Sequence, residues 1–134
     1  MLNFIRKWLP SKPQDIALNE FERLFARAMK DPAARPGFYL AFLHTELYVS
    51  GGFRGPGEAD LQYYDVAGEK VLPVFSHPDR LKKVLGAGAA ELKFKGEDLI
   101  RSVAPGQAMA LNPYSEFGRE FSSEELAEML SENS

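Results

Sequence analysis

Residues 112–118, with the sequence Asn-Pro-Tyr-Ser-Glu-Phe-Gly, bring polar and aromatic side chains directly after an apolar run. Amide, hydroxyl and carboxylate groups in so short a turn are suited to binding a small polar ligand or a partner chain. They are equally suited to satisfying the backbone amides of a tight connection between a strand and a helix. Both alternatives stay open, and the candidate binding residues here are Asn112, Tyr114, Ser115, Glu116 and Phe117.

The sequence offers no constellation that supports catalysis or a bound cofactor. His44 and His77 are the two histidines, and the absence of cysteine removes thiol nucleophiles and cysteine-based metal sites. A Ser/His/Asp triad can be assembled on paper from Ser76 or Ser115, but the Gly-x-Ser-x-Gly turn is missing. The glycine-rich residues 51–57 lack the Gly-Lys-Ser/Thr ending of a phosphate-binding loop. We therefore predict no catalytic residues, no metal and no cofactor, and favour a protein that is not an enzyme.

Aromatic side chains indicate a contact surface. They make up 12% of the chain, and several stand in predicted loops or strands. Tyr63 and Tyr64 are adjacent in a predicted strand, so they face opposite sides of it. Tyrosine tolerates half-burial and is enriched at protein interfaces. Tyr64, together with Phe53 in the glycine-rich stretch, is therefore a candidate for partner contact, with ordinary packing of these rings as the alternative.

Length and composition limit the class of protein. A chain of 134 residues suits one domain, and an apolar share of 45% is typical of a globular fold. The net charge of −3 disfavours nucleic acid as a partner. No apolar run approaches the roughly 20 residues of a membrane span. The absence of cysteine fits a cytosolic protein, so we expect a cytoplasmic location.

Residues 1–16 are predicted to form an N-terminal arm or short amphipathic helix that precedes the domain proper, residues 17–134. In a helix, basic side chains would lie opposite an apolar face formed by Phe4, Ile5, Trp8 and Leu9. A helix packed on the domain, a frayed arm and, for residues 1–10, a membrane-surface or partner-binding segment are the alternatives. The segment lacks the continuous apolar stretch and cleavage site of a signal peptide, so secretion is not expected.

Helical periodicity and capping signals predict five helices. Asn19 with Glu22 and Ser122 with Glu125 have the spacing of a capping box, in which each side chain satisfies a backbone amide near the other. Ser76 is predicted to cap the helix that follows it. The predicted helices cover residues 19–30, 33–44, 77–85, 97–103 and 122–130.

Strand patterns and turn residues complete the predicted fold. Residues 51–60 contain four glycines and a proline and are predicted to be a flexible loop. The apolar residues 108–111 indicate a strand buried on both faces. Pro113 is expected to hold Asn112 in extended geometry, and Gly118 to supply a positive φ. The predicted strands cover residues 46–50, 61–66, 70–75, 92–95 and 107–112. We expect an α+β fold with one mixed β-sheet of about five or six strands and several short helices packed on it.

Three segments carry a family resemblance. They are Val-Leu-Pro-Val-Phe-Ser at residues 71–76, Leu-Asn-Pro at 111–113 and Glu-Phe-Gly at 116–118, the last just before the capped final helix. Together they resemble the N-terminal domain of the SseB family, named for enhanced serine sensitivity, over about residues 19–131. The resemblance implies an α+β domain of bacterial origin with no established biochemical activity, and it transfers no catalytic residues. Members of that family often continue into a second, C-terminal domain, so we expect a single-domain version.

These observations favour a non-enzymatic interaction or regulatory module of the SseB type that binds another protein or a second copy of itself. The alternative is a small-ligand-binding domain, or an unrecognised enzyme, with a polar pocket near residues 112–118.

Overall fold

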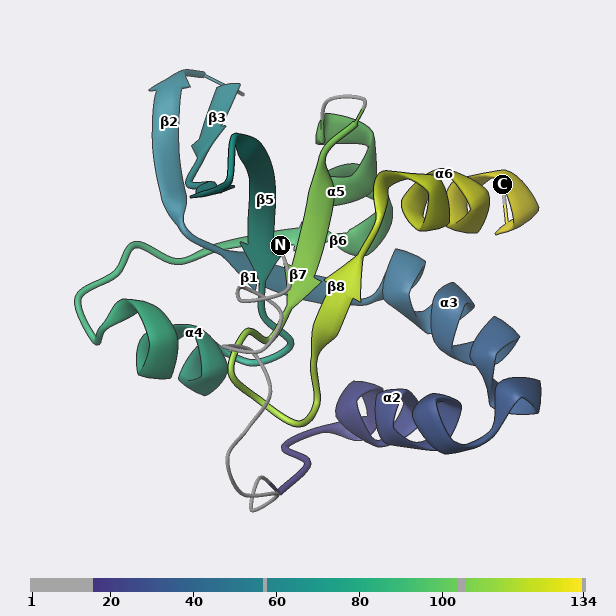
Figure 1. Ribbon diagram of the computed structural model, residues 1–134. Coiled ribbons are helices and arrows are strands. Elements are labelled where there is room, and N and C mark those ends of the chain that lie inside the picture. Colours follow the sequence, from purple (N-terminus) through teal and green to yellow (C-terminus); the bar gives the residue numbers. More distant parts are fainter. Residues whose placement is uncertain (1–15, 57, 104–105, 134) are drawn as a thin grey trace.

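The computed structural model describes residues 16–56, 58–103 and 106–133 of the chain. Within these ranges, helices and strands share the chain as an α+β fold (Figure 1), which confirms the predicted fold class. The expected arm over residues 1–16 lies, apart from Ile16, outside the described residues. None of the helices described is both long enough and apolar enough to cross a membrane.

The five predicted helices are present close to their expected bounds. Asn19 caps the first, because its Oδ1 accepts from the Glu22 backbone amide at 2.9 Å. Ser122 and Glu125 form the predicted capping box, with bonds of 3.1 and 3.2 Å between side chain and backbone. The helices are α2 (Glu20–Lys30), α3 (Arg35–His44), α4 (Pro78–Leu85), α5 (Gly96–Ser102) and α6 (Ser123–Asn133), with a short 3-10 turn η1 (Pro32–Ala34) before α3.

The cap of α4 differs from the prediction. The ring of His77, not the hydroxyl of Ser76, accepts the hydrogen bond from the backbone amide of Asp79, at 3.1 Å. Ser76 is instead buried, with 3% of its surface exposed. The reason is that Ser76 has partners from other parts of the chain, described below.

The strands form a four-stranded mixed sheet and two antiparallel pairs, in place of the single sheet of five or six strands. The mixed sheet has the order β4-β5-β7-β8, in which β5 and β7 run parallel. A bridge between Tyr48 and Phe75 joins the β1–β6 pair to the end of β5. The strands are β1 (Glu46–Val49), β2 (Gly51–Gly55), β3 (Glu58–Leu61), β4 (Tyr64–Val66), β5 (Glu69–Val74), β6 (Leu92–Lys95), β7 (Ala108–Leu111) and β8 (Arg119–Phe121).

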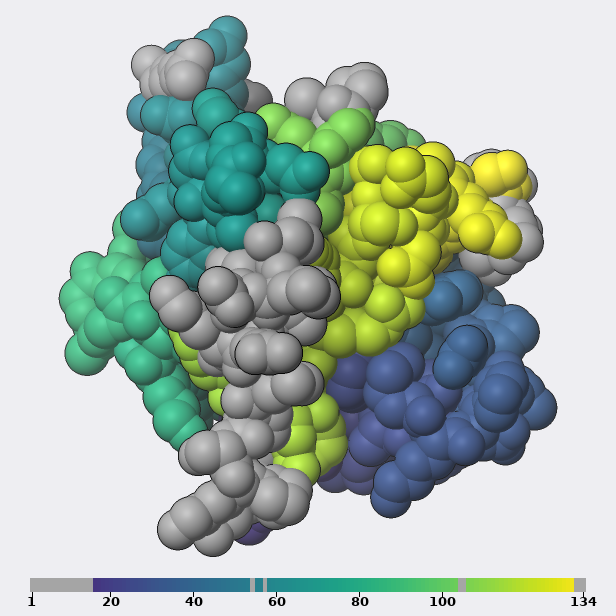
Figure 2. Space-filling model, viewed as in Figure 1, coloured from purple at the N-terminus to yellow at the C-terminus, as the bar shows by residue number. Residues whose placement is uncertain are grey.

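The prediction of a flexible loop over residues 51–60 is wrong, because these residues form the hairpin β2–β3. The glycines that suggested flexibility serve a close approach of the two strands. A Cβ added to Gly51 would lie 2.3 Å from the carbonyl oxygen of Asp60, so only glycine fits there. The hairpin rises at the upper left of the molecule in Figures 1 and 2.

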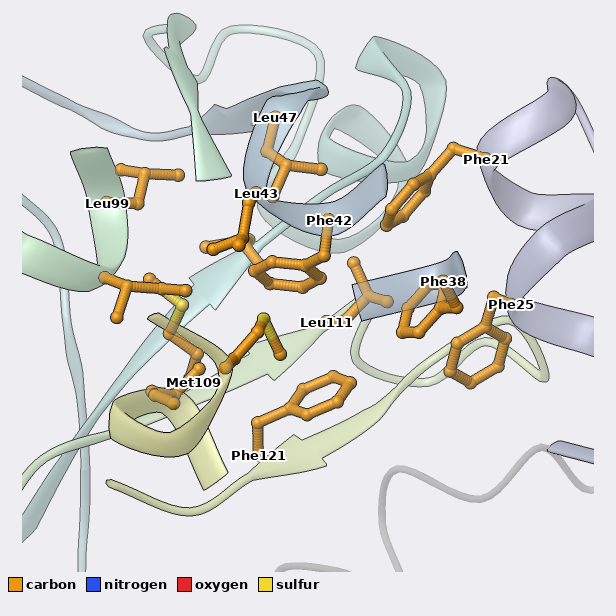
Figure 3. Packing of buried hydrophobic residues seen from close by; sticks show 14 of the residues in the cluster. Phe21, Phe25, Phe38, Phe42, Leu43, Leu47, Leu99, Met109, Leu111 and Phe121 are labelled. Atoms are coloured by element: carbon orange, nitrogen blue, oxygen red, sulfur yellow. The ribbon is translucent and has the colours of Figure 1, made fainter. Parts of the chain in front are cut away.

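The core is rich in phenylalanine and is shared by α2, α3 and the mixed sheet (Figure 3). The ring of Phe38 lies 5.3 Å from that of Phe21, 5.5 Å from Phe25 and 6.4 Å from Phe121, between centroids. Aromatic pairs at such separations add to the free energy gained by burying their area. This packing fixes α2 and α3 against the sheet.

Strand β7 is buried on both faces, as predicted. Met109 and Leu111 belong to the main core, while Ala110 packs with Val71 in a second buried cluster. Because side chains alternate along a strand, this arrangement requires apolar residues at every position. The end of β7 is therefore a rigid base for the residues that follow it.

Candidate functional site

Two turns meet at the carboxyl ends of the parallel strands β5 and β7. Val74 is paired with Leu111, and the backbone amide of Asn112 donates to the carbonyl oxygen of Val74 at 2.8 Å. The turn from β5 to α4 and the turn from β7 to β8 therefore begin side by side. In sheets with parallel strands, this edge is where binding sites are commonly built. It is also where the polar residues predicted at 112–118 lie.

Asn112 joins these two turns through its side chain. Its Oδ1 accepts from the backbone amide of Ser76 at 3.0 Å, and its Nδ2 donates to Ser76 Oγ at 2.8 Å. The same Nδ2 donates to the carbonyl oxygen of Phe117 at 3.0 Å. Asn112 is 1% exposed, so its amide serves as an internal connector of the two turns.

The backbone of Asn112 differs from the prediction. Its φ is +44°, in the left-handed region, although Pro113 was expected to keep it extended. Asparagine tolerates this region better than most residues because its short side chain forms local hydrogen bonds. The three side-chain bonds of Asn112 supply that compensation.

A buried ion pair lies behind this connector. Arg80 of α4 donates from Nη2 to Glu22 Oε1 at 2.8 Å and from Nε to Glu22 Oε2 at 3.1 Å. Ser76 Oγ donates to the same carboxylate, and so does the backbone amide of Leu18 at 2.9 Å. Asn19 closes the network by donating to the carbonyl oxygen of Ser76 at 2.9 Å. One continuous network therefore ties α2, α4 and both turns together.

The network holds Glu22 in its ionised form. Burial alone would raise the pKa of Glu22, but hydrogen bonds from Arg80, Ser76 and Leu18 outweigh it and bring the pKa below its ordinary value. The Ser76 hydroxyl, offered by the sequence as a nucleophile on paper, donates to this carboxylate. These contacts hold structure together, and none aligns a nucleophile with a histidine.

The residues after Tyr114 are also fixed. Ser115 Oγ accepts from the backbone amide of Phe117 at 3.1 Å. The ring of Phe117, 8% exposed, lies under the Arg80 guanidinium, 5.3 Å from its centroid. Gly118 does not take the predicted positive φ. It is needed for a close approach instead, since a Cβ there would lie 2.0 Å from the carbonyl oxygen of Leu111.

Tyr114 is the outward-facing member of this rigid turn. It is 51% exposed, and its φ of +69° is unusual for a bulky residue. A hollow of about 250 Å³ lies beside it, lined by Arg80, Lys83, Val84, Pro113, Tyr114 and Ser115. We call this hollow, together with the ring of Tyr114, the Tyr114 surface. It satisfies the expectation of a concave feature at residues 112–118.

Tyr64 of β4 neighbours the Tyr114 surface. Burial raises the pKa of the Tyr64 phenol, and the nearby phenol of Tyr114 raises it further. The two hydroxyls are thus close enough to interact electrostatically. The sequence pattern gave no sign that these two tyrosines meet, because they come from different strands.

The other predicted candidates fall into two places. Glu116 is half-buried in the same turn as Tyr114. Phe53 is 61% exposed on β2, in the hairpin that stands apart from α4 in Figure 1. The structure therefore brings Tyr64 and the candidates of residues 112–117 to one end of the mixed sheet, and separates Phe53 from α4.

Sequence reasoning missed Glu22, Arg80 and Lys83. Glu22 was interpreted as a capping residue of α2, and that helical spacing concealed its second role. Arg80 and Lys83 stand in an ordinary basic helix and gave no local signal. Among the described residues, no group of three His, Asp or Glu side chains is placed to hold a metal ion.

The chain is similar to known proteins over most of its length. The sequence profile of the SseB protein N-terminal domain matches residues 22–128. Protein SseB of Escherichia coli strain K12 and Protein SseB of Shigella flexneri are each 28% identical over 122 residues. The match covers 85% of this chain but 46% of each relative, so the chain spans about half the length of these proteins. No solved structure gives a significant match. The chain belongs to the SseB family, through its N-terminal domain.

Proposed function

We propose that this domain is a non-enzymatic interaction module that binds another protein, or a second copy of itself, through the Tyr114 surface. The observation that carries the proposal is the combination of backbone strain and exposure at Tyr114. A left-handed conformation at a bulky residue costs on the order of 1–3 kcal/mol, and such strain concentrates at functional sites. Half of the ring faces solvent, so burial in the domain itself compensates only in part.

The chemistry of the surface suits a protein partner. Tyrosine is favoured at interfaces because a rigid ring brings a large contact area and a hydroxyl at low entropic cost. Val84 and Pro113 give the hollow an apolar wall, and Lys83 supplies a positive charge at its rim. A partner would therefore place an apolar side chain in the hollow and a carboxylate near Lys83.

The buried network supports this role from behind. Asn112 and Phe117 hold the turn from within, so in this proposal they position Tyr114 rather than touch the partner. Tyr64 and Glu116 extend the contact area on either side. A turn that is already rigid loses little conformational entropy on binding, which favours affinity.

The test uses Tyr114→Gly in the full chain. Glycine adopts a φ of +69° without strain, so the variant removes the ring while keeping the fold. Affinity purification with mass spectrometry, and light scattering for self-association, should show a partner retained by the wild type and lost by Tyr114→Gly. Leu40→Ser is the matched control, because Leu40 is 47% exposed on α3 and lies outside the surface. Equal capture by wild type and Tyr114→Gly would contradict the proposal.

The hollow itself supports a second candidate, the binding of a small ligand. Its volume of about 250 Å³ is slightly below the roughly 300–1,000 Å³ of most ligand pockets, which favours the protein partner. Thermal-shift screening against small carboxylates and amino acids, serine included, tests it. A stabilising compound whose effect disappears in Lys83→Met would promote this candidate over the first.

A further inference from the structure

A groove of about 680 Å³ lies between β3 and α5, lined by other residues than the Tyr114 surface. Its floor is apolar and includes Leu61, Tyr63 and Phe94, which are half-buried and pack against the main core. Its volume lies within the range of established binding sites. An apolar floor of this kind leaves side-chain area available to an occupant.

One wall of the groove is a strand with an unpaired edge. All four residues of β3, Glu58–Leu61, line the groove. Among the described strands β3 pairs with β2 alone, so its second edge pairs with no described strand. Such an edge presents backbone amides and carbonyls in the spacing that another extended chain requires. The wall is therefore suited to an added strand.

Charge and alternation along β3 specify what that strand contains. Glu58 and Asp60 are two residues apart in an extended strand, so their exposed carboxylates share one face. Leu61 lies on the opposite face, at the apolar floor. Cross-strand neighbours interact most strongly, and opposite charges there are favourable. An incoming strand would place basic side chains beside Glu58 and Asp60 and apolar ones over the floor.

The remaining charges leave this pattern acidic. Lys70 also lines the groove, and Asp98 at the α5 wall is 3.7 Å from Arg101. A second copy of this chain would bring its own Glu58 and Asp60 against the same carboxylates if it paired through β3, which is unfavourable. A basic partner avoids that repulsion.

We propose that this groove binds an extended peptide segment with alternating apolar and basic side chains, added as a strand alongside β3. This site is independent of the Tyr114 surface.

The test titrates two fluorescein-labelled octapeptides, alternating Val-Lys and alternating Val-Glu, into the full chain at about 0.15 M salt, where long-range charge effects are screened. Fluorescence anisotropy should show saturable binding of the Val-Lys peptide. Glu58→Lys/Asp60→Lys should weaken it at least tenfold and create binding of the Val-Glu peptide. Glu58→Gln/Asp60→Asn should weaken it without creating the second preference.

The matched control is Glu124→Lys/Glu128→Lys on α6, which changes the net charge equally at two exposed positions. It should leave the affinity within twofold of wild type, and so should Tyr114→Gly. Equal weakening by the α6 variant, or no binding of the Val-Lys peptide to wild type, would overturn the proposal. A Val-Lys peptide N-methylated at alternate residues provides a second measurement. Undiminished binding of that peptide would rule out addition of a strand, because its backbone donors are removed.

Discussion

The Glu22 carboxylate in α2 accepts two hydrogen bonds from the Arg80 guanidinium in α4, at 2.8 and 3.1 Å. Their side chains are 1% and 9% exposed. Buried charges are tolerated when each is paired and its remaining hydrogen-bonding sites are filled. Here Ser76 and Leu18 supply further donors to the carboxylate. The ion pair therefore determines where α2, α4 and the turn before α4 can meet.

Removing the cation should be costly. Arg80→Met keeps much of the side-chain volume but leaves the Glu22 carboxylate buried without its charged partner, and we expect a loss of about 3–5 kcal/mol in the free energy of unfolding. Urea denaturation at pH 7 measures this loss. Arg101→Met is the matched control, because its pair with Asp98 is exposed and spans 3.7 Å. That variant should change stability by less than about 1 kcal/mol.

Adding Glu22→Gln to Arg80→Met separates charge from packing. The double variant has no buried charge at this position, so it should recover part of the stability lost by Arg80→Met alone. If the two substitutions were simply additive, the ion pair would not be the cause of the loss.

The pH dependence of the same variant follows from the lowered pKa of Glu22. A carboxyl whose pKa is lower in the folded state contributes stability above its unfolded value of 4.5, and that stability is lost as the pH falls through the folded pKa. In Arg80→Met, burial without the cation should raise this pKa, so protonation should stabilise that variant. The gap in unfolding free energy between wild type and Arg80→Met should therefore narrow between pH 7 and pH 3. A gap independent of pH would contradict this assignment.

Local chemistry made the helices predictable, whereas contacts between distant residues did not follow from the sequence. The capping boxes at Asn19 and Ser122 are short-range patterns, and the structure has helices at both. The strand pair β2–β3 was missed because its glycines resemble a flexible loop unless the opposing backbone is known. The roles of Glu22 and Arg80 depend on a meeting of two helices far apart in the sequence, for which no local signal exists.

The candidate site shows the same division. Residues 112–118 stood out because polar residues follow an apolar strand, and the structure does place them at a sheet end. Which of them face solvent depends on φ values and on the network behind them. The amide of Asn112 bonds inward, while Tyr114 faces out beside the hollow. The pattern of residue types alone cannot distinguish these two orientations.

Two substitutions at Asn112 separate its side-chain bonds from its backbone strain. Asn112→Gly loses the side-chain bonds but tolerates a φ of +44°, whereas Asn112→Ala loses the bonds and also strains the backbone. Each buried group left without a partner costs about 1–3 kcal/mol, and the strain adds about 1 kcal/mol to the alanine variant. Thermal and urea unfolding should rank wild type above glycine and glycine above alanine. Equal losses would show that the left-handed backbone at this position carries no cost.

Gly118→Ala should disrupt the turn between β7 and β8. The added Cβ would lie 2.0 Å from the carbonyl oxygen of Leu111 and 2.4 Å from that of Asn112, and both are backbone atoms of a buried segment. We expect a loss of at least about 3 kcal/mol, at the upper end of overpacking effects. Gly88→Ala is the control, because nothing lies within 4 Å of its Cβ position. A change of less than about 1 kcal/mol in Gly118→Ala would mean that the two backbones are free to separate.

Glu120 on β8 should limit the stability of the domain at neutral pH. Its Oε1 is buried and has no hydrogen-bond partner. Burial raises the pKa of Glu120, and the negative charge of Glu69 raises it further. A carboxyl with a raised pKa in the folded state disfavours folding once the pH exceeds the unfolded value of 4.5, and this penalty is complete above the folded pKa.

Glu120→Gln removes that charge and keeps the shape of the side chain. The variant should be more stable than wild type by roughly 1 kcal/mol at pH 7, a common scale for a single stabilising substitution. Below pH 4.5 the wild-type carboxyl becomes protonated in both states, so the difference should approach zero. Unfolding by urea at pH 7 and pH 3.5 measures both quantities, with Glu128→Gln at an exposed position of α6 as the control. A stabilisation that persists unchanged at pH 3.5 would show that the charge of Glu120 is not its cause.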